Sequence, residues 1–303
     1  MGYIPVKGRT ALLLAALSLA LGSSPLAVLT AAWGSLENTV EQAELLEGLA
    51  LPWSLPLYTL LGLALPLALA PLAYVYWNNS RYTDALAKQL PTFFKGVADG
   101  VRAGMTLDRA LATSAEATGD PLRSEVQNIL TMLSLGVPFR EALSRATERV
   151  PVPVFRRAAS LLAAAYESGG RVADVLGAAA EMYGMLRGYE EERKARMATY
   201  IWVTYIALAV FLITATIITS VFVGPLYTLR APGLVTPPPP HLFKAGFFIA
   251  AYIQAIFGGL ISGKISRGTV KAGVTHTMVM ALAVVAYFNV QEIFLEPLLT
   301  PQL

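Results

Sequence analysis

Five long intervals of the chain contain no Asp, Glu, Lys or Arg, and they limit the possible folds more than any other feature. A bilayer's hydrocarbon core is about 30 Å thick, so a helix needs about 20 apolar residues to cross it. Each interval can hold one such helix. The intervals cover residues 10–36, 48–80, 197–229, 245–263 and 272–291. They predict membrane spans near 11–32, 54–76, 199–222, 246–263 and 272–290.

Composition supports the same class of protein. Of the 303 residues, 55% are hydrophobic and only 14% are charged, whereas about a quarter of the residues in a soluble domain are charged. The chain has no cysteine, which excludes disulfides, thiolate nucleophiles and cysteine-bound metals. The net charge of +3 comes from interspersed bases and acids, so we predict no nucleic-acid partner.

The N-terminal interval has two interpretations. Lys7 and Arg9 precede the apolar run from Leu12 to Leu21, as in a secretory signal. The run then resumes as far as Ala32, which is longer than a signal core. We favour a retained span, and cleavage would leave the rest of the topology unchanged.

Residues 78–197 contain 16 Lys/Arg and 14 Asp/Glu, which is most of the chain's charge. Apolar residues in this block recur at helical spacing. The pattern predicts an all-α protein with about five membrane helices and a cytoplasmic six-helix bundle between spans two and three. The predicted helices cover 84–104, 107–117, 121–135, 138–150, 153–168 and 171–197. The predicted domains are a membrane hairpin with an acidic outer loop (1–77), the bundle (78–197) and a three-span membrane region (198–303).

A weak repeat of 32 and then 33 residues aligns Gly104, Gly136 and Gly169, each followed by an apolar residue three positions later. Such a period also occurs in helical solenoids. The solenoid signature residues are missing here, so we favour a bundle. We also expect Thr106 and Asp120 to cap helices, with Pro121 in a first turn.

Positive charge in short flanking segments predicts the cytoplasmic side. If five spans alternate, Lys7, Arg9, Arg81 and the link with Lys264, Arg267 and Lys271 fall on one side. The acidic loop with Glu37, Glu41, Glu44 and Glu47, the loop 224–245 and the tail fall on the other. We therefore expect the N-terminus and residues 78–197 inside, and the C-terminus outside.

We identify no catalytic residues, no metal ligands and no cofactor, and we predict that the protein is not an enzyme. Gly258, Gly263 and Lys264 match the start of a nucleotide-binding loop, but Ile265 follows and the segment ends a membrane helix. Gly259 and Gly263 instead form the G-x-x-x-G spacing that lets membrane helices approach closely. His276 is expected to be a hydrogen-bonded interface residue. The predicted spans contain no charged residue, which argues against an ion-driven transporter.

Basic residues provide the candidates for partner contact. Arg140, Arg145 and Arg149 lie opposite the apolar face of their helix, where a merely solvated face is the alternative. Lys264, Arg267 and Lys271 occupy the short link between the last two spans. We treat these six residues as candidate contacts for a cytoplasmic partner.

Several motifs resemble one family in their order along the chain. They are Leu90-Pro91-Thr92-Phe93-Phe94, Gly100, Gly104-Met-Thr-Leu-x-x-Ala-Leu, Gly136-Val-Pro-Phe-x-x-Ala-Leu and Ser168-Gly169-Gly170. They resemble the type II secretion F domain. Gly258-Gly259-Leu-Ile-Ser-Gly263-Lys-x-Ser-x-Gly268 and Gly273-x-x-His276 resemble the last hairpin of the platform proteins of archaella, archaeal pili and tight-adherence pili. The resemblance covers about residues 84–290.

This resemblance implies a membrane platform protein of a type IV filament or a type II-like secretion machine. Such a protein couples a hexameric cytoplasmic secretion ATPase to the extraction of prepilin-like subunits from the membrane. The chain has one such domain where many platform proteins have two, so a second copy or a second single-domain subunit is expected, together with membrane lipid. The alternative is the membrane subunit of an ATPase-energised solute transporter.

Overall fold

The computed structural model describes residues 3–6, 8–33, 41–46, 49–228 and 240–295. Residues 229–239 of the expected loop 224–245 lie outside the described residues, as do Glu37 and Glu47 of the acidic loop. Ten helical elements longer than a single turn make up most of the described chain: α1 (Arg9–Ala31), α3 (Leu55–Arg102), α4 (Leu107–Thr118), α5 (Leu122–Ser134), α6 (Phe139–Arg149), α7 (Pro153–Glu167), α8 (Val172–Ile217), α9 (Gly224–Thr228), α10 (Pro240–Arg267) and α11 (Gly273–Val290). Shorter or irregular turns are η2 (Gly169–Arg171), η3 (Ile218–Val223), η4 (Val270–Ala272) and η5 (Gln291–Leu295).

The all-α class and the number of candidate spans are confirmed. In the described residues, five helical segments are long and apolar enough to cross a membrane: Arg9–Ala31, Leu55–Arg102, Gly169–Leu226, Pro240–Arg267 and Val270–Phe294. The sequence did not predict the short antiparallel hairpin of β1 (Glu41–Leu46) and β2 (Leu49–Trp53). This hairpin lies in the connection between the first two spans, where the pattern predicted only a loop.

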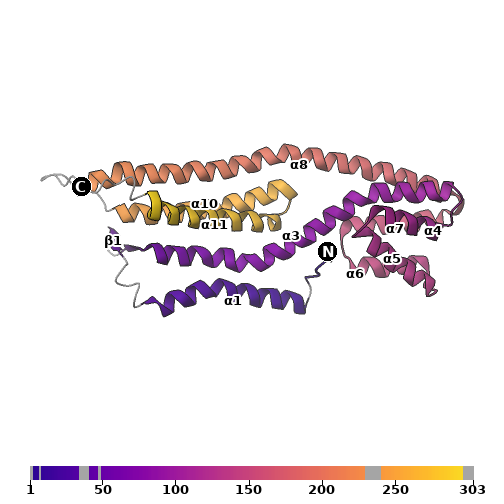
Figure 1. The fold of residues 1–303 in the computed structure, drawn as a ribbon, viewed down its shortest axis with the longest axis horizontal. Helices are drawn as coiled ribbons and strands as arrows, with labels where there is room; N and C mark the ends of the chain where they lie inside the picture. The colour runs from indigo at the N-terminus through magenta and orange to yellow at the C-terminus, as the bar shows by residue number, and fades with distance from the viewer. Residues whose placement is uncertain (1–2, 7, 34–40, 47–48, 229–239, 296–303) are drawn as a thin grey trace. The chain divides into compact units, whose positions relative to one another are not determined.

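The chain divides into two compact units. The charged unit contains Trp77–Ala195 together with the chain up to Val6, and the membrane unit contains Lys7–Tyr76 and Arg196–Leu303. The helices α3 and α8 each contribute residues to both units without a break in the helix (Figure 1). The three-part division predicted from the sequence stays a prediction.

The core of the charged unit is built from apolar stripes of α3 to α8. On α3, Leu86, Leu90, Phe93, Phe94 and Val97 are almost completely buried. They recur at the three- and four-residue spacing that places side chains on one face of a helix. The other helices supply smaller residues to the same core, among them Leu111, Ala115, Val126, Ile129, Ala142, Leu143, Ala158, Leu162 and Leu176.

Two turns of the charged unit have the same backbone geometry. Gly104 and Gly136 have φ values of 86° and 82°, which favour glycine because it lacks a Cβ. Gly104 N–H donates to the Val101 carbonyl and Met105 N–H to the Gly100 carbonyl; Gly136 and Val137 repeat both bonds. This pair of bonds is the Schellman motif that ends a helix. The two turns therefore form a structural repeat at the predicted spacing.

The predicted helix caps differ from those observed. Thr106 forms no side-chain cap, and only its carbonyl accepts the Ala110 N–H at 2.9 Å. Helix α5 begins at Leu122, so Pro121 precedes its first turn. Asp120 instead accepts a hydrogen bond from the Ser124 hydroxyl at 2.6 Å, and this bond lowers the pKa of Asp120.

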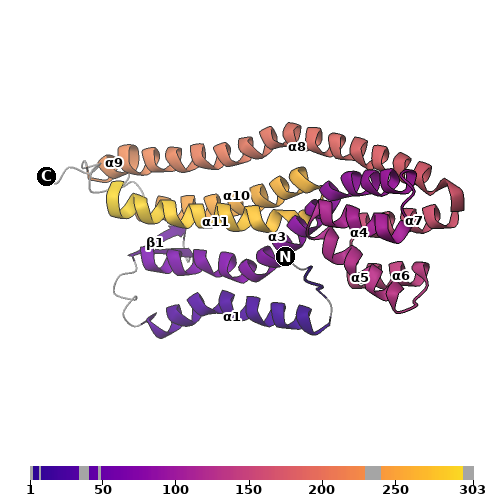
Figure 2. The same ribbon diagram turned by 45° about the vertical axis from the view of Figure 1, so that its right-hand side comes forward.

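In the membrane unit, α10 and α11 lie side by side, as Figures 1 and 2 both show. The aromatic rings of Tyr58, Phe248 and Phe288 pack together with centroid separations of 5.0 and 5.2 Å. Tyr252 donates a hydrogen bond of 2.7 Å to the Gly62 carbonyl on α3. A Cβ at Gly22 on α1 would lie 2.6 Å from the Ala68 Cβ of α3, so these two helices also approach closely.

Candidate interaction surfaces

The three arginines of α6 do not form a single free patch. Arg140 pairs with Glu167 at the end of α7, at 3.4 Å. Arg145 pairs with Glu141 one turn earlier on α6, at 2.6 Å. Arg149 pairs with Glu125 of α5. All three are exposed as predicted, but only Arg140 and Arg145 have partners that are themselves well exposed.

Glu125 is the centre of a buried polar network that the sequence interpretation missed. The residue is only 7% exposed. Its Oε1 accepts a 2.8 Å hydrogen bond from the Tyr82 hydroxyl, and its Oε2 pairs with Arg149. Burial, then the contact with Glu125, raises the pKa of Tyr82 well above its usual range. The network ties α3, α5 and α6 together, which gives Arg149 a structural role.

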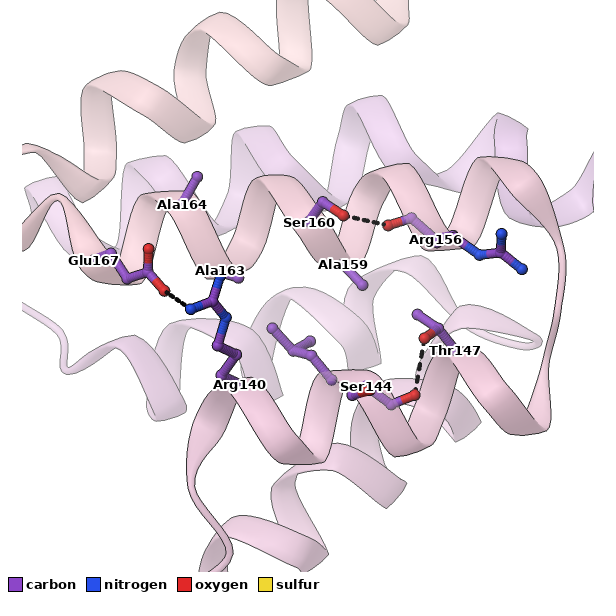
Figure 3. A pocket seen from close by; sticks show the side chains of 10 residues that line it. Arg140, Ser144, Thr147, Arg156, Ala159, Ser160, Ala163, Ala164 and Glu167 are labelled. Carbon is purple, nitrogen blue, oxygen red and sulfur yellow. Dashed lines mark hydrogen bonds and ion pairs between the residues drawn. The ribbon is translucent and has the colours of Figure 1, made fainter.

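A groove of about 280 Å³ lies between α6 and α7 (Figure 3). Leu143, Ala159 and Ala163 supply its apolar surface, and Arg140 and Arg156 supply its positive charge. In the close view, Arg140 reaches from α6 toward Glu167 on α7, while the Arg156 guanidinium lies toward the other end of α7. The small side chains of α7 leave this surface hollow, and Arg140 borders it.

The second basic group surrounds the turn from α10 to α11. Lys264 and Arg267 lie in the last turn of α10, and Lys271 lies in η4. All three are exposed. The Thr269 hydroxyl in this turn is 3.4 Å from the Tyr76 hydroxyl on α3. The basic turn therefore lies at the end of the membrane unit where α3 leaves it.

Gly259 and Gly263 lie where α10 packs against α11. A Cβ at Gly259 would overlap the backbone of Thr277, and a Cβ at Gly263 would overlap the backbone of Gly273. Gly258, Gly263 and Lys264 all belong to the uninterrupted helix α10. Because a nucleotide-binding loop needs free backbone N–H groups at the start of a helix, this segment has the wrong conformation for one.

The membrane unit also contains two polar contacts between helices. The Tyr205 hydroxyl on α8 lies 2.9 Å from His276 Nδ1 on α11. Lys244 pairs with Glu292 at 3.3 Å, and the lysine is 8% exposed. The predicted loop 224–245 included Lys244, but α10 begins at Pro240 and therefore includes this residue. In the described part of the chain, no three His, Asp or Glu residues are grouped as a metal site would require.

A family known from other proteins matches the part of the chain that carries the α6 arginines and the α6–α7 groove. Residues 93–220 match the profile of the family described as Type II secretion system (T2SS), protein F. Over this range the chain is similar to the F domain of that family. The match begins in α3, includes α4 to α8 and ends within η3. The basic turn and the α10–α11 hairpin lie outside the matched range.

The chain is also similar to an uncharacterized protein of Methanocaldococcus jannaschii. The two sequences are 24% identical over 226 residues, which cover 75% of this chain and 36% of the relative. The chain thus spans about a third of the length of that relative. No solved structure matches the chain significantly.

Proposed function

We propose that this protein is a membrane platform of a type IV filament, of the archaeal pilus or archaellum type, or of a type II-like secretion machine. The F domain and the five candidate spans indicate a multi-pass membrane platform protein of the type II secretion and type IV pilus class. In the proposed role, the charged unit contacts a hexameric secretion ATPase. The membrane spans guide prepilin-like subunits, and a second copy or second single-domain subunit completes the platform.

The continuity of α3 and α8 carries this proposal. Each helix contains core residues of the charged unit and also a predicted membrane span. An unbroken helix has no flexible linker that would absorb a displacement. A force applied by an ATPase to the charged unit is therefore passed to two spans through helical backbone.

The orientation in the membrane is part of the proposal. The amide of Asn79 on α3 forms two 2.8 Å hydrogen bonds with the backbone of Ile4, and the Tyr3 ring packs against Tyr82 at 6.0 Å. These contacts support a retained first span, because cleavage would remove them. We propose a cytoplasmic N-terminus and charged unit with an external C-terminus, which labelling of single cysteines from each side of the membrane will test.

Arg140 and Arg145 are the proposed ATPase contacts on α6, with Lys264, Arg267 and Lys271 as a second candidate group. Both arginines pair only with exposed acids, so an acidic surface can replace these partners at small cost. Arg149 is left out of the test, because its replacement would leave Glu125 buried without its cation.

The test uses the full-length protein in nanodiscs and the purified secretion ATPase of the same organism. Wild-type protein should bind, and the double variant R140E/R145E should bind about ten- to a hundredfold more weakly because charge reversal turns attraction into repulsion. Arg109→Glu is the matched control, since Arg109 is an exposed arginine on α4. Lack of binding by the wild-type protein would refute the ATPase-coupled platform, and unchanged binding by the double variant would remove α6 from the contact.

A further inference from the structure

Helix α8 carries an apolar stripe that the fold leaves uncovered. Met182, Met185, Leu186 and Tyr189 are 43%, 66%, 45% and 72% exposed. The side of α8 that faces its own bundle is different, because Leu176, Ala179 and Tyr183 are buried in the core there. Large apolar side chains this exposed and this close together are typical of a contact surface.

The stripe has the spacing of a coiled-coil seam. Val175, Ala178, Met182, Met185 and Tyr189 follow one another at intervals of three, four, three and four residues. This is the alternation of the two apolar positions in a heptad, which keeps a seam facing a parallel partner helix. The next two positions in the same register are Glu192 and Arg196, so the apolar seam ends at Tyr189.

A hollow extends the seam toward the start of α8. It has a volume of about 370 Å³, and its lining includes Leu161 of α7 with Val175, Ala178, Ala179 and Met182 of α8. Methionine is flexible enough to fill an irregular apolar space of this kind. The hollow therefore gives a methionine from a facing helix a place to pack.

Lipid does not explain the stripe. Arg187 lies on the same helix between the apolar residues of the stripe. The charged run from Glu190 to Arg196 follows directly after them. The predicted span starts about ten residues after Tyr189, which is roughly 15 Å along a helix. The hydrocarbon core would not hold so many charges, so the stripe lies outside it.

We propose that a second copy of this chain covers the stripe, through a parallel, in-register pairing of the two α8 helices. Because α8 continues into a membrane span, every copy inserted in the same bilayer holds this helix in the same direction. A two-fold axis parallel to the helices then places each stripe residue opposite its own counterpart. A seam of this length buries an area on the order of 1,000 Å², near the lower limit of specific interfaces. Confinement to one membrane raises the effective concentration of the partner.

The absence of cysteine from the chain allows a direct test. Single-cysteine variants of the full-length protein in native membranes are oxidised, and disulfide-linked dimers are measured. Met182→Cys and Met185→Cys place the thiols on the seam. Gly184→Cys and Glu191→Cys are matched controls at exposed positions of the same helix that face away from the seam. Labelling each variant with a maleimide confirms that all four thiols are reactive.

The two seam variants should form dimers at least about fivefold more efficiently than the controls, because only seam positions bring the thiols within disulfide distance. Lowering the expression level should leave this ratio unchanged, which distinguishes a stable pair from random collision. Equal cross-linking on both sides, or none at the seam, would overturn the proposal. Cross-linking of the seam to a different protein would also overturn it, since the stripe would then have another occupant. The inference rests on the second copy in the proposed function and on membrane anchoring, but not on the ATPase contact, so failure of ATPase binding would not affect it.

Discussion

Glycines at two places in the molecule solve opposite problems. Gly104 and Gly136 in the charged unit have positive φ, and a Cβ on either would meet no atom within 4 Å. Gly259 and Gly263 in the membrane unit lie inside a regular helix, and a Cβ on either would overlap the backbone of α11 or the turn before it. Glycine is required at the first pair by the backbone conformation, and at the second pair because there is no room for a side chain.

The difference follows from the solvent around each unit. In water, burial of large side chains drives helices together, so glycine is useful where a helix must end. Between membrane helices the lipid is as apolar as the side chains, so close backbone approach supplies much of the attraction. Substitutions at these positions should therefore differ in size and even in sign.

The largest effect is expected at the helix contact. Gly263→Leu places a side chain where the Gly273 backbone lies, and α10 and α11 must separate. Overpacking of this kind should cost about 3 kcal/mol or more. The variant should accumulate several-fold less in membranes on immunoblots. Gly246→Leu on the same helix is the control, because a Cβ at Gly246 would meet no atom within 4 Å. Equal loss of both variants from membranes would contradict the packing explanation.

A smaller effect is expected in the buried network of the charged unit. Arg149→Ala leaves Glu125 with only the Tyr82 hydroxyl. A fully buried pair would lose about 3–5 kcal/mol, but the Arg149 side chain is half exposed, so we expect about 1–3 kcal/mol. Thermal unfolding in detergent should show the loss as a lower Tm. Arg145→Ala removes an exposed pair and should leave Tm nearly unchanged; a similar fall in both would mean that Glu125 has no special role.

The smallest effects, of opposite sign, are expected for two alanine substitutions. Gly136→Ala forces a Cβ into a positive-φ turn and should destabilise the protein by about 1 kcal/mol. Gly184→Ala lies inside α8 with open space around it and should stabilise the protein by up to about 1 kcal/mol. Chemical denaturation followed by tryptophan fluorescence can rank both variants against the wild type. If both substitutions changed the stability in the same direction, the backbone conformation at Gly136 would not be what decides the effect there.

Much of the fold could be predicted because it depends on local pattern. Charge-free intervals located five candidate spans, and helical spacing located helices whose apolar residues, such as Leu143 and Leu162, are buried. Gly104 and Gly136 indicated helix ends, because glycine is the residue that most readily adopts the positive φ found just after a helix. The caps were less predictable, since Thr106 forms no side-chain cap and the Asp120 side chain accepts a hydrogen bond from the Ser124 hydroxyl.

The surfaces depended on contacts distant in sequence, and here pattern was insufficient. Arg149 looked equivalent to Arg145 because both are exposed on α6. Only the packing of α5 against α6 shows that Arg149 pairs with a buried acid. The position of Glu125, three residues after Leu122 on an apolar face, was the available signal. The exposed stripe of α8 was also missed, because its residues match an ordinary core pattern until their exposure is known.

The chain passes between the two units three times, after Val6, after Tyr76 and after Ala195. A unit connected by a single chain segment can rotate about that segment, whereas each additional connection restricts the rotation. Two of the three crossings run through helices, which resist twisting as well as bending. In the proposed platform, rotation of the charged unit would therefore wind the helical backbone of α3 and α8, so torque, and not displacement alone, is a load that these two helices would pass to their spans.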